Sequence, residues 1–404
     1  MTGSVAVVGG GQAGATVSHA LRQRGFDGEI LLLTADDELP YERPPLSKGI
    51  LRGEEAVRVL PASFYDENKI DLRLRAAATR VDRGQRQLEV GLESGEMIVA
   101  DVVVLATGSR PRRLQFPGSG LDNVLTLGSL RDARRIRALL PDLEHVVIAG
   151  AGFVGTEVAA AIRSEGCEVT VVEPVANPLQ SKIGPWASAF IKDLHEARGV
   201  RFVQDSVAAA VGSSSVESVV TAQGETLRCQ LLLIAVGSEP NLEVALASGI
   251  DSSDGIVCDA SGRTSMAGVW AAGDIASWPF GPLGMLRVEH YRTAIDQAQV
   301  IARAVSGNDL PEKLVPWFWT DQYDRRIEVA GRPDQGTLAI ERTGPDGRTR
   351  VTVHLRGDRV VGAIGLDSPR EIRAASNLIR GGDEVDPSLI EDPSVDLRKV
   401  AVPA

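Results

Sequence analysis

The sequence predicts an α/β fold built from two domains of the same architecture, and three observations support this. Two G-x-G-x-x-G motifs each lie between a short apolar run and a helical pattern. The strand that follows each helix leads into an acidic residue. A later segment also repeats, as VLATGSRP at 104–111 and as LIAVGSEP at 233–240. One such motif is weak evidence, whereas two in the same context predict a duplicated fold.

The first copy starts with an apolar strand at residues 5–8, followed by Gly9, Gly11 and Gly14 and then a helical pattern. In this motif the first glycine permits a tight turn and the second lets the backbone approach a pyrophosphate. The third lets the helix pack closely on the strand. The N–H groups at the start of the helix then face the phosphates. Asp36 lies 22 residues after Gly14 and is the candidate acid for a ribose hydroxyl.

The second copy has Gly150, Gly152 and Gly155 in the same spacing. Its helical pattern is followed by a strand that finishes in Glu173, 18 residues after Gly155. A ribose-binding acid is expected at this place.

Each half then continues through alternating segments with turns to an apolar strand that ends in a glycine, Gly108 or Gly237. We therefore expect two parallel sheets, each covered by helices on one face and by a small antiparallel sheet on the other. A further apolar strand ends at Gly273 and Asp274. An aspartate at this place suits a ligand hydroxyl, although the same residue could simply be a helix N-cap.

Composition narrows the classes of function. The chain has 404 residues and a net charge of −11, which argues against a nucleic-acid or anionic-membrane partner. It has no apolar run near the ~20 residues of a spanning helix, and its first residues lack a basic n-region, so we expect a cytoplasmic protein. Cys167, Cys229 and Cys258 are too far apart in sequence for a redox pair. We expect them to be reduced and partly buried, and we expect no metal site.

Over essentially its whole length the sequence resembles the bacterial FAD-dependent, NADH-linked ferredoxin reductases of the putidaredoxin and rubredoxin reductase type. The resemblance is carried by GGGQAG, LPYERPPLSK, ATGSRP, GAGFVGTEVAA, VVEP, AVGSEPN, WAAGD, RVEHYRTAIDQA and PWFWTDQYD. The paired glycine motifs are shared with the wider flavin disulfide-reductase superfamily. RPPLSK and PWFWTDQYD are far more particular to this branch.

The resemblance implies a flavin disulfide-reductase-like fold with two Rossmann-like dinucleotide-binding domains, one inserted in the other, and a C-terminal α+β domain. The FAD domain would comprise residues 1–112 and 238–315, the NAD domain 113–237 and the C-terminal domain 316–404. A five-stranded sheet is expected in the last of these. RIEVAG, TLAIER, RVTVHLRG and RVVGAIGLD indeed alternate like antiparallel strands, and SPREIRAASNLIRGG is typical of a helix.

The resemblance also implies site residues. Those expected to contact FAD are Gly9, Gly11, Ala13, Gly14, Asp36, Arg43, Lys48, Val81, Asp274, Tyr291 and Trp319. Those expected to contact NAD are Gly150, Gly152, Gly155, Glu173 and Gly237. Lys48 and Glu157 are the expected catalytic pair.

Three positions depart from the family pattern. Ala35 stands where relatives often have their ribose acid, so the ribose contact of Asp36 is open. Gly128 lies near the place of an arginine, and Tyr291 stands where many relatives have tryptophan.

The segment LPYERPPLSKG at 39–49 contains no cysteine. Disulfide reductases of this superfamily place a redox-active cysteine there, so electrons on the flavin of this chain are expected to leave directly to an outside acceptor. Lys48 is the expected cation beside the flavin, where it favours the reduced anionic form by at most ~4 kcal/mol at ~4 Å and an effective dielectric of ~20. Glu157 is expected to hold this lysine, whereas spacing alone would also fit a solvated surface lysine.

Trp317, Phe318, Trp319 and Tyr323 fall within seven positions. Such a cluster fits a domain-junction core, and it fits equally well a lid on the flavin that also forms part of a docking surface.

The leading hypothesis is an NADH-dependent ferredoxin reductase. A hydride from NADH would pass to FAD, and single electrons would then pass to a 2Fe–2S ferredoxin that supplies a haem monooxygenase or a ring-hydroxylating dioxygenase. The alternatives are a flavoprotein NADH oxidase or disulfide-reductase relative, and an interaction protein like apoptosis-inducing factor. The oligomeric state, monomer or weak dimer, stays open. Because both partners would be acidic, docking is expected to need a local basic patch, with candidates Arg292, Arg303, Arg325, Arg326, Arg370, Arg373 and Arg380.

Overall fold

The computed structural model describes residues 3–307, 312–344 and 349–402. Its contacts divide the chain into two compact units, each assembled from separate stretches of sequence. Unit 1 comprises Met1–Glu42, Val57–Arg110 and Pro240–Pro316, and unit 2 comprises Arg43–Ala56, Pro111–Glu239 and Trp317–Ala404. The segment 43–56 was predicted within the FAD domain, yet its contacts are with unit 2. The predicted domain borders themselves stay predictions.

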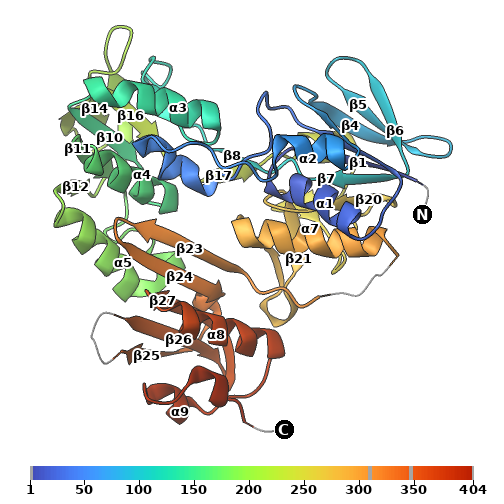
Figure 1. Ribbon diagram of the computed structural model, residues 1–404. Coiled ribbons are helices and arrows are strands. Elements are labelled where there is room, and N and C mark those ends of the chain that lie inside the picture. The colour runs from blue at the N-terminus through green and yellow to red at the C-terminus, as the bar shows by residue number, and fades with distance from the viewer. Residues whose placement is uncertain (1–2, 308–311, 345–348, 403–404) are drawn as a thin grey trace. The chain divides into compact units, whose positions relative to one another are not determined.

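Unit 1 is organised around a five-stranded parallel sheet of order β20-β7-β1-β2-β3. Strands β1, β7 and β20 of this sheet are labelled in Figure 1. Its strands are β1 (Ser4–Val8), β2 (Glu29–Leu33), β3 (Ile70–Arg73), β7 (Val102–Leu105) and β20 (Val269–Ala271). In β1, four consecutive residues are buried, because both faces of the sheet are covered. Helix α1 (Gln12–Gln23) contacts β1 and β2 and packs against α7 (Tyr291–Val305).

Smaller elements complete unit 1. A three-stranded antiparallel sheet contains β4 (Ala78–Arg83), β5 (Leu88–Leu92) and β6 (Met97–Ala100). A four-stranded sheet contains β18 (Ser252–Ser253), β19 (Gly255–Val257), β21 (Ala276–Pro279) and β22 (Met285–Arg287). The remaining helices are α2 (Ala62–Glu67) and α6 (Glu243–Ala247).

Unit 2 repeats this plan with a parallel sheet of order β12-β11-β10-β16-β9. Its strands are β9 (Val124–Thr126), β10 (His145–Ala149), β11 (Glu168–Val172), β12 (Val200–Val203) and β16 (Leu231–Ile234). Its helices are α3 (Leu130–Leu139), α4 (Phe153–Ser164) and α5 (Gln180–Glu196). The antiparallel strands β13 (Val207–Val211), β14 (Ser218–Thr221) and β15 (Thr226–Arg228) share one hydrophobic core with β10 and β16. The sequence-based prediction of a small antiparallel sheet packed on a parallel one is thus confirmed here.

The C-terminal part of unit 2 is an antiparallel sheet of order β23-β24-β27-β26-β25. Its strands are β23 (Trp317–Gln322), β24 (Arg325–Gly331), β25 (Leu338–Thr343), β26 (Arg350–Arg356) and β27 (Arg359–Leu366). Helices α8 (Pro369–Gly381) and α9 (Pro387–Glu391) follow. The aromatic residues 317–319 therefore belong to β23, at the edge of the sheet. This strand completes the five, and the sequence pattern alone had not assigned it.

Two short segments connect these parts. The prolines of RPPLSK lie in a 3₁₀ helix, Pro44–Ser47, which is followed by a second one, Ile50–Arg52. Strands β8 (Ser109–Pro111) and β17 (Ser238–Pro240) form a two-stranded sheet, and each contains a point at which the chain passes from one unit to the other. Within the described residues, no helix combines the length and the apolar character that a membrane-spanning segment needs.

Candidate functional site

The first glycine loop is crowded at two of its glycines and open at the third. Gly9 has φ +125°, and a Cβ built on it would lie 2.1 Å from the carbonyl oxygen of Ala106. A Cβ on Gly14 would lie 1.9 Å from the carbonyl oxygen of Gly9. A Cβ on Gly11 would meet nothing within 4 Å. Gly11 therefore borders free space at the start of α1, where a pyrophosphate would bind to backbone N–H groups.

Polar groups from distant segments converge beside this loop. A Cβ on Gly273 would lie 3.1 Å from Cβ of Ala13, which places the Gly273–Asp274 turn against α1. The Gly273 N–H donates to Gln297 Oε1 (2.8 Å), and Ser109 Oγ donates to Asp274 Oδ2 (2.9 Å). Gln297 is fully buried, and its Nε2 has no partner among the described residues. An orphaned amide beside an open glycine loop is what a bound polar cofactor would leave behind, so these residues fit FAD.

The acid of the first half is not in the position that the second half uses. Val8 pairs with Leu33 in the first parallel sheet, and Ala149 pairs with Val172 in the second. Thr34, which follows Leu33, therefore occupies the position in the first sheet that Glu173 occupies in the second. The Thr34 hydroxyl accepts from the Asp36 N–H (3.1 Å). Asp36 itself accepts from the hydroxyl of Tyr41 (3.4 Å). Its contact with FAD stays a prediction.

Two further predicted FAD residues also lie in unit 1. The hydroxyl of Tyr291 donates to Glu42 Oε1 (2.8 Å), and burial, followed by this hydrogen bond, raises the pKa of Tyr291 to about 12. Val81 is fully buried, and its N–H donates to Ser248 Oγ (2.7 Å). The Val81 N–H is thus already used, and the contact of Val81 with FAD stays a prediction.

The second glycine loop repeats the geometry of the first. A Cβ on Gly150 would lie 2.4 Å from the carbonyl oxygen of Ala235, and one on Gly155 would lie 2.1 Å from that of Gly150. The nearest atom to a Cβ on Gly152 would be the Ala235 oxygen at 3.9 Å. Gly237, at the end of the neighbouring strand, has φ +100° and also borders open space.

Glu173 lies directly at this loop. Its carboxylate accepts from the N–H groups of Ala151 (2.8 Å) and Val175 (3.3 Å). Val175, whose N–H bonds to this carboxylate, leaves 56% of its surface exposed. An anchored carboxylate next to an exposed apolar side chain fits the adenosine part of NAD, whose ribose hydroxyls would donate to it.

Lys48 and Glu157 form an ion pair, as the family resemblance implied. Lys48 Nζ lies 3.0 Å from Glu157 Oε1, and the Glu157 side chain is 7% exposed. Two hydroxyls that the sequence analysis missed also donate to this carboxylate, Ser47 Oγ to Oε2 (2.5 Å) and Thr320 Oγ1 to Oε1 (2.7 Å). A buried carboxylate needs such partners, because removing it from water is costly unless it is paired and hydrogen-bonded.

Trp319 and Arg43 belong to the same unit as this pair. Trp319 stacks on Trp317 with ring centroids 5.3 Å apart, and its indole Nε1–H donates to Asp321 Oδ2 (2.9 Å). The Arg326 guanidinium lies 5.8 Å from the Trp319 ring centroid. Arg43 precedes the first 3₁₀ helix. The structure thus groups Arg43, Lys48 and Trp319 with unit 2 and the first glycine loop with unit 1, and their FAD contacts stay predictions.

The structure explains why glycine occupies position 128. A Cβ at this position would lie 2.5 Å from Cδ of Pro111, so a larger residue would clash. The Gly128 N–H donates to Asp132 Oδ2 (3.1 Å), next to the capping box that Ser129 and Asp132 form at the start of α3.

The cysteines offer no thiolate. All three are free and buried, and burial raises the pKa of each thiol, to about 12 for Cys229. A reactive cysteine needs the opposite environment, exposed and electropositive. Among the described residues, no cluster of His, Cys, Asp or Glu is arranged to hold a metal ion.

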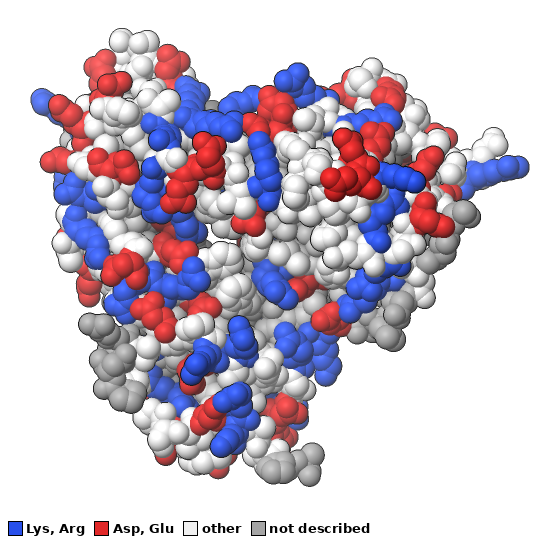
Figure 2. Space-filling view, in the orientation of Figure 1, with Lys and Arg blue, Asp and Glu red and all other residues white. Residues whose placement is uncertain are grey.

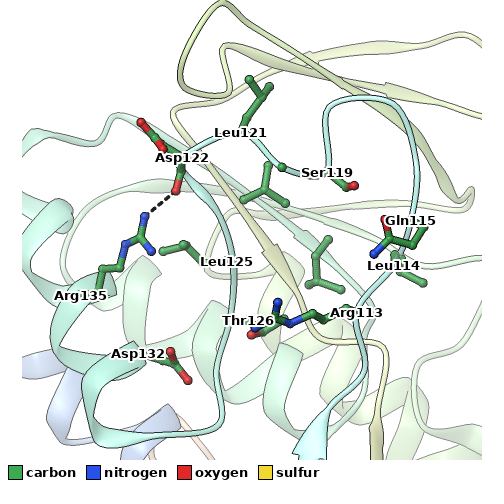
Figure 3. A pocket seen from close by; sticks show the side chains of 13 residues that line it. Arg113, Leu114, Gln115, Ser119, Leu121, Asp122, Leu125, Thr126, Asp132 and Arg135 are labelled. Carbon is green, nitrogen blue, oxygen red and sulfur yellow. Dashed lines mark hydrogen bonds between the residues drawn. The ribbon is translucent and has the colours of Figure 1, made fainter.

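A cavity of about 440 Å³ lies elsewhere in unit 2, between α3, the edge strand β9 and the loop before it (Figure 3). Arg113, Asp122, Asp132 and Arg135 supply its charged groups, and Arg135 Nη2 donates to the carbonyl oxygen of Asp122 (2.7 Å). None of the predicted site residues lines it.

Comparisons with known proteins cover nearly the whole chain. The model of the pyridine nucleotide-disulphide oxidoreductase family matches residues 3–298, and that of the reductase C-terminal domain matches 317–401. The chain is 36% identical to the anthranilate 1,2-dioxygenase system ferredoxin–NAD(+) reductase component of Burkholderia cepacia, over 97% of this chain and 98% of that protein.

Solved structures agree with this. The ferredoxin reductase for the CYP199A2 system from Rhodopseudomonas palustris has a TM-score of 0.93 and 32% identity, over 99% of this chain and 100% of that one. The covalent putidaredoxin reductase–putidaredoxin complex gives a TM-score of 0.93 and 30% identity, over 98% of both chains.

Proposed function

The chain belongs to the pyridine nucleotide-disulphide oxidoreductase family, and on that premise we propose that it is an FAD-dependent NADH:ferredoxin reductase. The observation that carries the proposal is the combination of two open glycine loops with Lys48, on a segment without cysteine, paired to the buried Glu157 of α4. A disulfide reductase would need a redox-active thiol on that segment, and the three cysteines of this chain are buried elsewhere.

In this proposal, the loop at Gly9, Gly11 and Gly14 holds the FAD pyrophosphate, with Asp274 and Gln297 beside it. The loop at Gly150, Gly152 and Gly155 holds NADH, and Glu173 accepts from its ribose. Bound FAD supplies the redox chemistry, since it accepts two electrons as a hydride and can release them one at a time. The reaction balances as NADH plus two oxidised ferredoxins giving NAD⁺, one proton and two reduced ferredoxins.

The chain's own residues orient and stabilise. We infer that Lys48 supplies a fixed positive charge that favours the reduced cofactor, worth at most ~4 kcal/mol at ~4 Å and an effective dielectric of ~20. Glu157 holds Lys48 at 3.0 Å, which moderates this charge and keeps the ammonium in one place. Glu173 repels a 2′-phosphate, so NADH is preferred over NADPH.

The partner is a 2Fe–2S ferredoxin that passes electrons to a haem monooxygenase or a ring-hydroxylating dioxygenase, and we place the reaction in the cytoplasm. The net charge is −11, yet basic and acidic side chains are interspersed over the visible face (Figure 2). Four of the candidate docking arginines are engaged in ion pairs, namely Arg292, Arg303, Arg325 and Arg326. Arg370, Arg373 and Arg380, on α8, are exposed and are therefore the first candidates for docking an acidic ferredoxin.

The test is a stopped-flow measurement of both half-reactions with a panel of 2Fe–2S ferredoxins, from low to high salt. Hydride transfer from bound NADH should change little with salt. Ferredoxin reduction should slow, because screening shortens to ~8 Å near physiological ionic strength. Charge reversal at Arg370 and Arg373 should slow only the ferredoxin step. Failure to reduce any ferredoxin of the panel would refute the assignment.

A further inference from the structure

The edge strand β23 contacts helix α4 through alternate residues. Phe318 packs on Phe153 with ring centroids 4.8 Å apart, and Thr320 donates to Glu157. Two residues further on, Gln322 Nε2 donates to Thr156 Oγ1 (2.9 Å). Residues 153, 156 and 157 share one face of a helix, and 318, 320 and 322 share one face of a strand. The C-terminal sheet is thus fitted to the helix that begins at the second glycine loop.

The hydrogen bonds on this face form a directed chain. Gln322 Oε1 and His195 Nε2 lie 2.9 Å apart, and both residues are fully buried. An amide oxygen only accepts, so His195 carries its proton on Nε2 and donates. Gln322 Nε2 in turn donates to Thr320 Oγ1 (2.9 Å). The Thr320 hydrogen is then directed at Glu157 Oε1, and each bond in the chain polarises the next.

A branch of this series of hydrogen bonds reaches the second glycine loop. The Thr156 hydroxyl that accepts from Gln322 donates to the carbonyl oxygens of Gly152 (3.0 Å) and Phe153 (3.1 Å). One buried amide therefore holds two hydroxyls, one bound to the glycine loop and the other to the Glu157 carboxylate.

We propose that Thr320 is a positioning residue of the reaction, oriented by Gln322 and His195, which holds the Glu157 carboxylate and through it the ammonium of Lys48. This rests on the proposed function, because the charge of Lys48 matters only beside a redox cofactor. Without the Thr320 hydroxyl, Lys48 is the one remaining partner of Glu157 Oε1 among the described residues, and the ammonium is drawn more tightly to the carboxylate. Less of its charge then favours the reduced cofactor.

The test compares Thr320→Val, which removes the hydroxyl and keeps the shape, with Thr320→Ser, which keeps the hydroxyl. The matched control is Thr352→Val. Thr352 is another buried threonine of the same sheet, and its hydroxyl accepts from Trp186 Nε1 (2.6 Å) rather than taking part in the site. Each purified variant is measured for flavin content, thermal midpoint, the rate of hydride transfer at saturating NADH and the midpoint potential of the bound flavin.

Thr320→Val should keep its flavin yet transfer hydride about ten-fold more slowly, as expected for the loss of one hydrogen bond to a charged group. Its midpoint potential should become more negative by about 30 mV, the two-electron equivalent of ten-fold. Thr320→Ser should restore both values, and Thr352→Val should lose stability without changing either. If Thr320→Val does not fold, Thr320→Ala removes the same hydroxyl without occupying its space.

A folded Thr320→Val variant with the rate and potential of the wild type would overturn the proposal, and so would equal losses in Thr352→Val. Gln322→Met should shift the potential in the wild-type background and add nothing in the Thr320→Val background, because of the two hydroxyls that Gln322 holds it is that of Thr320 that bonds to Glu157. A further shift in the double variant would refute this order of action. Failure of the proposed function would be visible separately, as wild-type protein that holds no flavin or reduces no ferredoxin.

Discussion

The two glycine loops have almost the same backbone geometry, but their acidic residues are placed differently. In both loops the first glycine lies against an alanine carbonyl, the third lies against the carbonyl of the first, and the second borders open space. Beside the second loop, the residue directly after the neighbouring strand is Glu173, which accepts from the Ala151 N–H. In the first loop it is Thr34, and a Cβ on Gly10 would lie 2.5 Å from the Cβ of Thr34. The loops therefore share the backbone geometry that suits a phosphate, and they differ in what they would offer a ribose.

This difference matters because the two cofactors have different tasks. A carboxylate beside the ribose distinguishes NADH from NADPH, since it accepts from the 2′-hydroxyl and repels a 2′-phosphate. A tightly held FAD needs no such discrimination. We therefore expect changes at the glycines to act alike on the two loops, and changes at the acids to act differently.

The largest effect is expected at the open glycines. Gly11 and Gly152 both have extended backbones with negative φ, so valine is tolerated by the fold and fills the space of the pyrophosphate. Gly11→Val should abolish flavin binding. Gly152→Val should leave the flavin bound and abolish its reduction by NADH. The absorbance ratio of flavin to protein and the rate of NADH oxidation measure the two outcomes, and full flavin in Gly11→Val would refute the assignment of the first loop.

The next effect concerns the acids. A repulsion of ~1–4 kcal/mol between Glu173 and a 2′-phosphate corresponds to a preference for NADH of roughly 5- to 1000-fold. Glu173→Gln keeps an oxygen for the Ala151 N–H and should lose most of this preference, measured as the ratio of kcat/KM values for the two nucleotides. Asp36→Asn serves as the counterpart and should retain its flavin. Equal efficiency of the wild type with both nucleotides would refute the role of Glu173.

Acid should lower the stability of unit 2 through the buried His195. Burial lowers the pKa of His195 to about 4. The unfolded chain therefore binds this proton more readily than the folded one, and stability falls as the pH drops from about 6.5 to about 4. The shift corresponds to about 3 kcal/mol. Denaturation by urea across this range should show the loss in the wild type and not in His195→Gln, whereas parallel curves would contradict the role of His195.

The smallest effect is expected for the cysteines, because all three are free and buried. Replacing Cys167, Cys229 and Cys258 together by serine should leave NADH-dependent ferricyanide reduction within a few-fold of the wild type. A variant that folds, binds flavin and does not turn over would support the disulfide-reductase alternative.

Local patterns in the sequence predicted much of this protein. The spacing of Gly9, Gly11 and Gly14, and of their counterparts in the second half, is set by the turn itself, so the loops and their strands were predicted correctly. The absence of cysteine at 39–49 likewise needs no structure to interpret. The alternation in WFWTDQ carried a signal that was missed, because it places Phe318, Thr320 and Gln322 on one face of a strand.

What the tertiary structure alone decided are the relations between residues far apart in the chain. Thr34, rather than Asp36, is the structural equivalent of Glu173. Thr34 lies 20 residues after Gly14, whereas Glu173 lies 18 residues after Gly155, and only the strand pairing reveals this offset. Ser47 and Thr320 meet Glu157 across 110 and 163 residues of sequence. A local pattern records the turn or helix that a residue belongs to. It does not record which distant hydroxyl satisfies a buried carboxylate, because that depends on how sheets and helices pack.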